Sequence, residues 1–329
     1  MNPSASALAR AIECPASVAL PQVATTSDAA RRGSQIHGYI AARLAGVSRA
    51  SALALVDAEH HPTCEGIDFA KVGGDLSAVK AEAAYAYDVR QRSVRLVGHN
   101  VGRNYGPMGD NEIAGTNDFE GLRLDGVPVV ADVKTGQPVT ACRENPQMMF
   151  HALVQMIRTG ASEVDARIIY VREDGGVKLD SWTFDVFTLE EFADELDVML
   201  GRVTRARLAV AQGDVRVSTG DHCRYCPALQ ACPAYVSLAR TMATDLDGVA
   251  QKIAALAPDD AGKAWALLDR VGKIYDVTKD ALKAYATQQP IPLPNGQMVK
   301  EVPYERSAFN QGAAIALLRG KGATDEDDA

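Results

Sequence analysis

The sequence predicts an α/β fold. The first observation is a strand–helix–strand unit of about 45 residues, which within one sheet forms a right-handed crossover. Its first strand ends at Lys134, its helix begins at Pro146, and its second strand covers Ala166–Val171. The second observation is a pair of helical patterns outside this unit, over residues 27–46 and 188–212.

The elements before the crossover carry two candidate polar residues. Residues 27–46 predict a helix that is capped by Ser27-Asp28 and closed by Gly46. His37 borders the apolar side of this helix, where a lone histidine is more often structural than catalytic. Residues 79–89 alternate well enough for a strand that carries Glu82, and the plain alternative is a solvated acid on an edge strand.

The first crossover strand brings acidic and basic side chains together. Its apolar run Val127–Val130 continues into Asp132 and Lys134, which point to the same face because side chains alternate along a strand. Asp118 lies fourteen residues before Asp132. Two carboxylates beside an ammonium suit a divalent metal such as Mg²⁺ or Mn²⁺ and an attacking water. Considered alone, the same pattern also fits a solvated strand end with a surface salt bridge.

The crossover helix begins beside this strand end. Pro146 fits its first turn, an apolar stripe runs to Ile157, and the helix ends near Thr159-Gly160. Gln147 in the first turn could orient water or contact DNA, or be an ordinary surface glutamine. The later helix, 188–212, is expected to open with a capping box of Thr188 and Glu191.

The cysteines predict a metal or iron–sulfur centre. Three of the six form a tight cluster with C-x2-C-x5-C spacing, and a fourth, distant cysteine precedes a proline. Four thiolates suit a [4Fe–4S] cluster or a structural Zn²⁺. Disulfides are not expected, because no signal peptide is visible and the chain reads as cytoplasmic. The cluster is Cys223, Cys226 and Cys232; spacing leaves the fourth ligand open among Cys14, Cys64 and Cys142.

Two domains are expected: a core over residues 1–236 and a mostly helical extension over 237–329. The extension carries no chemical motif, and packing on the core, DNA binding and recruitment of a partner all remain open for it. Its predicted elements are helices over 235–256 and 259–287, a hairpin over 290–303 around Asn295-Gly296, a helix over 307–319 and an acidic tail over 325–328.

Charge and hydropathy exclude some classes of protein. The 329 residues contain no apolar run near 18 residues, so no membrane span is expected. The net charge of −8 argues against a protein that coats DNA by charge alone. A local basic groove is still possible, although scattered solvated arginines explain the same residues; the candidates are Arg31, Arg32, Arg90, Arg92, Arg95 and Arg103.

Taken in order, these motifs resemble the RecB-like branch of the PD-(D/E)XK nuclease superfamily. The closest likeness is to its iron–sulfur members: the AddB nuclease domain, the nuclease of CRISPR adaptation modules and phage exonucleases. His151 departs from the usual aromatic residue at its position. The matching segments are Ser4-Ala5-Ser6 with Cys14-Pro15, Gly33 to His37, Glu82, Gly115 to Asp118, Asp132 to Gly136, Gln147 to His151, and the cysteine triplet.

This resemblance implies a restriction-endonuclease-like core, in which a mixed β-sheet is flanked by helices. It also implies a metal-dependent DNA exonuclease of phage or bacterial recombination or repair. It implies that Lys134 orients the nucleophilic water and that the cluster is structural, held by Cys14 with the triplet. DNA ends would be the substrate, and a recombination or helicase protein a possible partner. The implied metal ligands are Glu82, Asp118, Asp132 and the carbonyl of Val133, with His37 assisting and Gln147 nearby.

Two other interpretations stay open at this level. A protein that keeps the fold could bind or scaffold DNA ends without cleaving them, although the intact Asp118, Asp132 and Lys134 argue against this. A zinc ion could replace the iron–sulfur cluster.

Overall fold

The computed structural model of the 329-residue chain describes residues 2–23, 28–102, 104–135, 140–223 and 226–237, and parts of 272–300. The described parts of 272–300 are 272, 275–276, 279–280, 282–293 and 297–300. The chain divides into two compact units, Met1–Ile274 and Tyr275–Ala329. The sequence-based boundary after residue 236 stays a prediction.

The first unit is built on one sheet, as the sequence predicts. Its described strands follow the spatial order β2-β1-β3-β4-β5-β6. The β4–β5 pair is parallel and the other neighbours are antiparallel, so the sheet is mixed. The strands are β1 (Leu76–Asp88), β2 (Ser93–His99), β3 (Glu112–Arg123), β4 (Pro128–Lys134), β5 (Glu163–Val171) and β6 (Val177–Asp185).

The crossover helix lies where the sequence predicts it. α7 (Pro146–Thr159) connects the parallel strands β4 and β5. The side chain of Asn145 caps its start by accepting a hydrogen bond from the Gln147 N–H at 2.9 Å. The helix ends at Gly160, whose φ of 69° is a left-handed conformation that costs a glycine little. The first turn of α7 is therefore fixed beside the end of β4.

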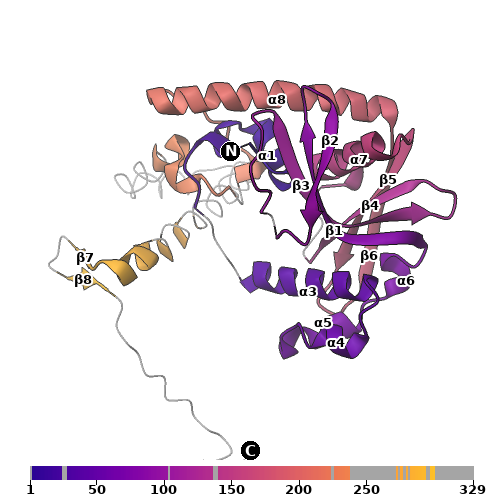
Figure 1. The fold of residues 1–329 in the computed structure, drawn as a ribbon. Helices are drawn as coiled ribbons and strands as arrows, with labels where there is room; N and C mark the ends of the chain where they lie inside the picture. The colour runs from indigo at the N-terminus through magenta and orange to yellow at the C-terminus, as the bar shows by residue number, and fades with distance from the viewer. Residues whose placement is uncertain are drawn as a thin grey trace, which may run out of the picture. The chain divides into compact units, whose positions relative to one another are not determined.

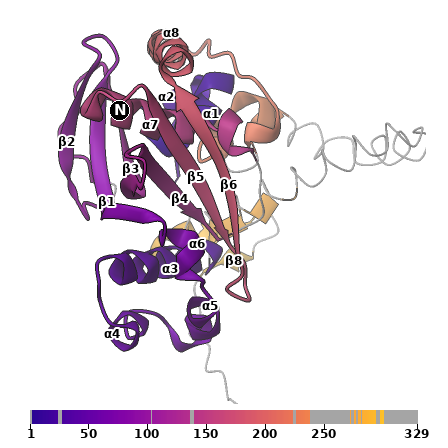
Figure 2. The same cartoon turned by 90° about the vertical axis from the view of Figure 1, so that its right-hand side faces the viewer.

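Helices cover both faces of the sheet (Figures 1 and 2). A hydrophobic core fills each side. One core joins the sheet to α1, α7 and α8, and the other joins it to α3, α5 and α6. Strand β4 alternates between them: Val130 faces the first core, and Ala131 and Val133 face the second. The α-helices besides α7 are α1 (Leu8–Glu13), α2 (Ala16–Ala19), α3 (Asp28–Leu44), α4 (Arg49–Leu53), α5 (His61–Glu65), α6 (Phe69–Val72) and α8 (Val186–Gln212).

The start of α8 corrects one sequence-based expectation. The helix begins at Val186, before the predicted Thr188. Asp185 caps it by accepting the backbone N–H of Thr188 at 2.8 Å. Aspartate is as good an N-cap as threonine, and here it ends β6 directly before the helix. The predicted capping box is therefore replaced by a single aspartate cap.

The N-terminal segment is integrated into the first unit. Ser4 forms a parallel bridge with Ala114 at the start of β3. Leu8 and Ala11 of α1 are buried in the same core as residues of α7 and α8. A third cluster joins Cys14 and Leu20 to the segment after α8, which contains the short 3-10 helices η4 (Asp221–Cys223) and η5 (Leu229–Ala231).

The second unit is described only in part. Residues 282–288 are helical, within the predicted helix 259–287 and one residue beyond it. β7 (Ile291–Pro292) pairs with β8 (Met298–Val299) in antiparallel fashion, which fits the predicted hairpin. The predicted turn Asn295-Gly296, the helix over 307–319 and the tail over 325–328 lie outside the described residues, as does the predicted helix 235–256 beyond residue 237. Among described residues, no helix has the length and apolar character needed to cross a membrane.

Candidate active site

Asp118 lies where β3, β4 and α3 meet. Its Oδ2 accepts the backbone N–H of Val133 on β4 at 2.5 Å. Its Oδ1 is 3.1 Å from Nδ1 of His37 on α3. The hydrogen bonds fix the carboxylate between the two strands, and they place His37 at the site rather than in the apolar core.

Asp132 and Lys134 share one face of β4, as the strand periodicity predicts. The Lys134 Nζ lies 2.7 Å from Oδ2 of Asp132, and the carboxylate is almost fully buried. Gln147, in the first turn of α7, donates from Nε2 to Oδ1 of Asp132 at 2.6 Å and accepts from Lys134 at 3.4 Å. Oδ2 of Asp132 has the ammonium nearby but no well-aligned hydrogen bond. The three side chains thus form a compact polar group in which one carboxylate oxygen is incompletely satisfied.

Glu82 faces this group through a break in β1. It falls between the pairs Ala81–Phe119 and Ala83–Asn117, opposite Asp118. Its φ of 52° is a left-handed conformation that is costly for a residue with a Cβ. Ala81 packs against the α3-side core and Ala83 lies in the α7-side core, although residues two apart on a regular strand share a face. The strained residue therefore switches the strand between faces and puts Glu82 on the cleft wall.

These residues line one cleft of about 970 Å³. One wall is α3, which presents mostly small side chains to the space. Gly33 eases the packing there, because a Cβ would lie 3.1 Å from Oγ1 of Thr135, just beyond the end of β4, which is a tight contact. The polar side chains that line the cleft include His37, Glu82, Asp118, Asp132, Lys134 and Gln147, and the small residues of α3 are Ala30, Gly33, Ser34, Gly38, Ala41, Ala42 and Ala45.

Gly115, the first residue of the motif that ends in Asp118, allows close packing under the cleft. A Cβ at this position would lie 2.5 Å from Cβ of Ala5 and 2.9 Å from ring atoms of Phe150 and His151. The glycine therefore lets the N-terminal segment and α7 both approach β3. This contact explains physically why a glycine precedes the aspartate.

The buried charges of the site act on one another. Burial raises the pKa of Asp132, and the neighbouring Asp118 carboxylate adds to this effect, although Lys134 opposes it. For Asp118, burial acts in the same direction but is outweighed by His37, the Val133 N–H and Lys134, so its pKa is lowered. For His37, burial is outweighed by the hydrogen bond to Asp118 and by both carboxylates, which raises its pKa. The two carboxylates therefore crowd negative charge in a place where a cation would be stabilised.

His151 lies directly behind this site on α7 and is fully buried. Desolvation lowers its pKa to about 4, so the ring is neutral at ordinary pH. Its Nε2 has no hydrogen-bond partner among the described residues. The imidazole packs edge-on against Phe150, as an aromatic residue would. The histidine therefore fills an aromatic position of the core.

A buried polar network connects the same elements below the cleft. The Glu120 carboxylate, two residues after Asp118 on β3, accepts hydrogen bonds from four side chains. The Tyr85 hydroxyl lies 3.0 Å from each carboxylate oxygen. Asn117 Nδ2 donates at 3.1 Å, Arg158 Nη2 donates at 2.9 Å, and Gln155 Nε2 is the fourth donor. The network ties β1 and β3 to α7, the elements that carry Glu82, Asp118 and Gln147. Local sequence patterns carry no signal for this network, because its members are far apart in the chain.

The four predicted cysteine ligands lie in one packed cluster. Cys14, Cys223 and Cys232 are buried there, and Cys226 packs against them. All four are free thiols, and burial raises the pKa of Cys226 and of Cys232. Across the described residues, no three His, Cys, Asp or Glu side chains are already arranged as a metal site. The alternatives Cys64 and Cys142 lie in the two main cores, away from this cluster.

Four of the six arginines proposed for a basic groove form ion pairs with carboxylates. Arg90 pairs with Asp197 at 3.0 Å, Arg92 with Asp194, and Arg95 with Glu112 at 2.6 Å. Arg32 pairs with Glu173 at 2.8 Å, and Arg103 lies outside the described residues. These arginines are largely neutralised by carboxylates on α8, β3 and the β5–β6 turn. Among the described residues that line the cleft, Lys134 is the one lysine, and none is an arginine.

Comparison with known proteins identifies a family. A family described as a protein of unknown function, DUF2800, matches residues 2–326. The chain belongs to DUF2800. No curated protein matches this DUF2800 chain.

Two solved structures show a weak likeness to the DUF2800 chain. The first is a candidate exonuclease from Eubacterium rectale, with 12% identity, a TM-score of 0.35, and coverage of 62% of this chain and 76% of that one. The second is SSO0001, with 11% identity, a TM-score of 0.31, and coverage of 69% and 85% respectively. At these TM-scores neither likeness carries an argument about fold or activity.

Proposed function

We propose that this DUF2800 protein is a metal-dependent DNA exonuclease with a restriction-endonuclease-like core. The observation that carries the proposal is the geometry at the end of β4. Asp132 and Lys134 share a face, and Asp118 is hydrogen-bonded to the residue between them. A carboxylate pair beside an ammonium in a cleft suits phosphodiester hydrolysis, in which negative charge develops on a phosphate.

The donor set fits a hard divalent cation. We assign Asp118, Asp132, Glu82 and the carbonyl of Val133 as ligands for Mg²⁺ or Mn²⁺, which favour oxygen donors. The incompletely satisfied Oδ2 of Asp132 and the raised pKa of that carboxyl are what a site built for an additional cation requires. The bound ion would lower the pKa of a water molecule and neutralise charge on the phosphate.

The remaining side chains have positioning roles. His37 holds Asp118 by its hydrogen bond and so keeps that carboxylate turned toward β4. Gln147 holds Asp132 and contacts Lys134, which leaves the ammonium able to orient a water or a phosphate oxygen. The side chain of Lys134 is 40% exposed, more than those of His37, Asp118 and Asp132, and it lines the cleft.

We further propose that Cys14, Cys223, Cys226 and Cys232 hold a [4Fe–4S] cluster, with structural Zn²⁺ as the alternative. Their packing in one cluster supports this assignment. The cluster would tie α1 and α2 to the segment after α8, as a link between residues more than 200 positions apart. Iron and sulfide assays of anaerobically purified Cys14→Ala and Cys142→Ala test it: Cys14→Ala should lose iron and Cys142→Ala should keep it.

A digestion time course tests the proposed activity. Single- and double-stranded DNA, labelled at one end, is incubated with metal-stripped protein and added Mg²⁺, Mn²⁺ or Ca²⁺. Mg²⁺ and Mn²⁺ should support release of nucleotides, whereas Ca²⁺, which prefers more ligands, should not. Circular single-stranded DNA should resist digestion, because an exonuclease needs an end.

Two variants and one control assign the site. Asp132→Asn and Lys134→Met should each reduce cleavage by about 100-fold or more. Lys178→Met, on the exposed edge strand β6, should cleave at the normal rate. Cleavage in EDTA, or normal cleavage by Asp132→Asn, would contradict the assignment. DNA-end binding without any cleavage would instead support the alternative, a non-catalytic scaffold.

A further inference from the structure

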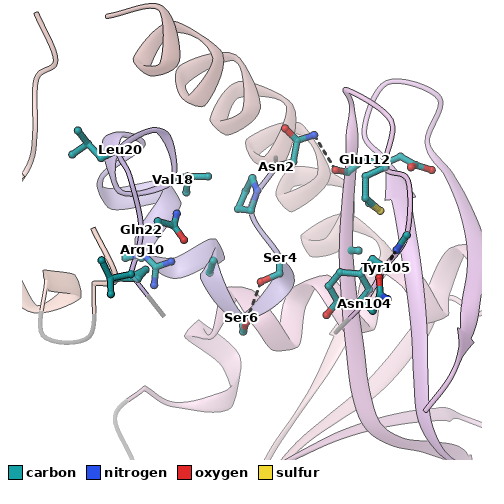
Figure 3. A pocket seen from close by; sticks show the side chains of 17 residues that line it. Asn2, Ser4, Ser6, Arg10, Val18, Leu20, Gln22, Asn104, Tyr105 and Glu112 are labelled. Atoms are coloured by element: carbon teal, nitrogen blue, oxygen red, sulfur yellow. Dashed lines mark hydrogen bonds between the residues drawn. The ribbon is translucent and has the colours of Figure 1, made fainter. Parts of the chain in front are cut away.

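A second cavity of about 720 Å³ lies next to the candidate active site. One wall consists of Arg10 on α1 with Val18, Leu20 and Gln22 in and after α2 (Figure 3). The facing wall is the loop between β2 and β3, including Asn104 and Tyr105, and the base is the segment from Asn2 to Ala7. None of these residues has a role in the proposed chemistry.

The two cavities share part of their walls. Ser6 and Tyr105 line both of them. A ligand that extends from Lys134 therefore passes Tyr105 before it enters the second cavity. Tyr105 is half-buried, and its hydroxyl lies 3.5 Å from Oγ1 of Thr116, a distance at which a hydrogen bond is weak at best. Among described residues, no other ring or cation stacks on it.

Arg10 supplies the positive charge of the second cavity. Its Nε is buried and has no hydrogen-bond partner among the residues that the structure describes. The carboxylate that lines the same cavity, Glu112, is already bound by Arg95. Among the described lining residues, each cavity therefore has one lysine or arginine side chain. It is Arg10 in the second cavity and Lys134 in the cleft of the candidate active site.

We infer that the two cavities form one track for a single DNA strand. The phosphate to be cleaved lies at Lys134, a base stacks on Tyr105, and a neighbouring phosphate is bound by Arg10. Stacking on an aromatic side chain requires an unpaired base, and the described walls offer too few cations for both backbones of a duplex. The position of the cleaved phosphate rests on the proposed function, whereas the Arg10 and Tyr105 contacts do not require cleavage.

Equilibrium binding tests the track without relying on turnover. Fluorescein-labelled octathymidylate is titrated with the full chain in Ca²⁺ at several salt concentrations. Arg10→Gln is expected to bind about 10-fold more weakly, with a log–log salt slope shallower by about 0.7, the value for one phosphate contact on a single strand. Tyr105→Leu should bind about 10-fold more weakly with an unchanged slope, and Tyr105→Phe should bind normally.

Matched variants separate the possible outcomes. Arg172→Gln, exposed on the β5–β6 turn, should leave affinity and slope unchanged. Arg10→Lys keeps the positive charge, so it should retain most of the salt dependence of binding. It also serves as the second test of this position if Arg10→Gln does not fold. Normal binding by folded Arg10→Gln and Tyr105→Leu would overturn the track, as would tighter binding of a duplex of equal length.

The same variants distinguish failure of the track from failure of the proposed function. Wild-type protein that does not cleave but shows the predicted binding pattern would remove the nuclease proposal and keep the track. Normal cleavage without any Arg10 or Tyr105 dependence would do the reverse. Arg10 also lies near the thiols of Cys14 and Cys226. Loss of iron with unchanged DNA binding in Arg10→Gln would assign this arginine to the cysteine cluster and overturn its place in the track.

Discussion

Replacing Glu120 with glutamine tests how firmly the base of the cleft is held. The substitution keeps the size of the side chain but exchanges one carboxylate oxygen for an NH₂ group. In the native protein both oxygens accept hydrogen bonds: Oε1 from Arg158 and Oε2 from Asn117 and Gln155, with Tyr85 near both. In either orientation, the NH₂ group of the new glutamine therefore faces another hydrogen-bond donor: Arg158 at the Oε1 position, or Asn117 and Gln155 at the Oε2 position.

The cost follows from which donor loses its acceptor. The amide nitrogen is expected to replace Oε1, because Arg158 is about one-third exposed and can turn toward water. Asn117 and Gln155 are buried, so their amide groups cannot turn toward water. Loss of one charge-assisted hydrogen bond, and of the charge from those that remain, gives a destabilisation of about 2 to 3 kcal/mol. This corresponds to a fall of roughly 4 to 12 °C in melting temperature for a domain of this size.

Urea and thermal unfolding measure this effect. The control is Glu163→Gln on the exposed start of β5, which should change the free energy of unfolding by no more than about 0.5 kcal/mol. Because the network links β1, β3 and α7, cleavage by folded Glu120→Gln is also expected to fall. A loss of less than 1 kcal/mol would refute the reasoning, since it would mean that the four donors can be satisfied without a carboxylate.

Three further outcomes are expected. Hydrogen bonds from Arg95 lower the pKa of Glu112 from 4.5 to about 2, so stability should decrease as pH falls from 4.5 toward 2. In a plot of the urea unfolding midpoint against pH, Arg95→Gln should flatten this part of the curve. Burial lowers the pKa of His151 from 6.5 to about 4. As pH falls from 6.5 toward 4, the unfolded chain therefore takes up a proton at this histidine before the folded protein does, and stability should fall. An imidazole titration by NMR with a midpoint above pH 6 would contradict this. Because φ at Glu82 is 52°, Glu82→Gly should be about 1 kcal/mol more stable than Glu82→Ala in chemical denaturation, and equal stabilities would show that the backbone there is unstrained.

Much of the central fold is predictable from local sequence. The β-branched run of β4, the Pro start and Gly end of α7, and the apolar β5 each lie close to where periodicity places them. β2 and β6 were not predicted, because both are edge strands with largely exposed faces. A strand that buries little needs no hydrophobic alternation, so its sequence carries little signal.

The site is predictable only where its residues are neighbours in one element. The shared face of Asp132 and Lys134 follows from strand geometry and is confirmed by their 2.7 Å contact. The strained backbone of Glu82 has no such signal, because it is imposed by packing on both faces of the sheet. The arginines are similarly ambiguous, since some of their carboxylate partners lie far along the chain: Asp194 is 102 residues from Arg92, and Glu173 is 141 residues from Arg32.

The N-terminal segment has a consequence for how the protein is made. α1 is synthesised before α8, yet it packs against α8 and, through Cys14, against the segment around Cys232. At synthesis rates of 5–20 residues per second, the roughly 220 intervening residues take about 10 to 40 s to appear. During that time the apolar face of Leu8 and Ala11 has no partner in α8. The N-terminal segment can therefore complete its packing only after α8 and the cysteine segment have been synthesised.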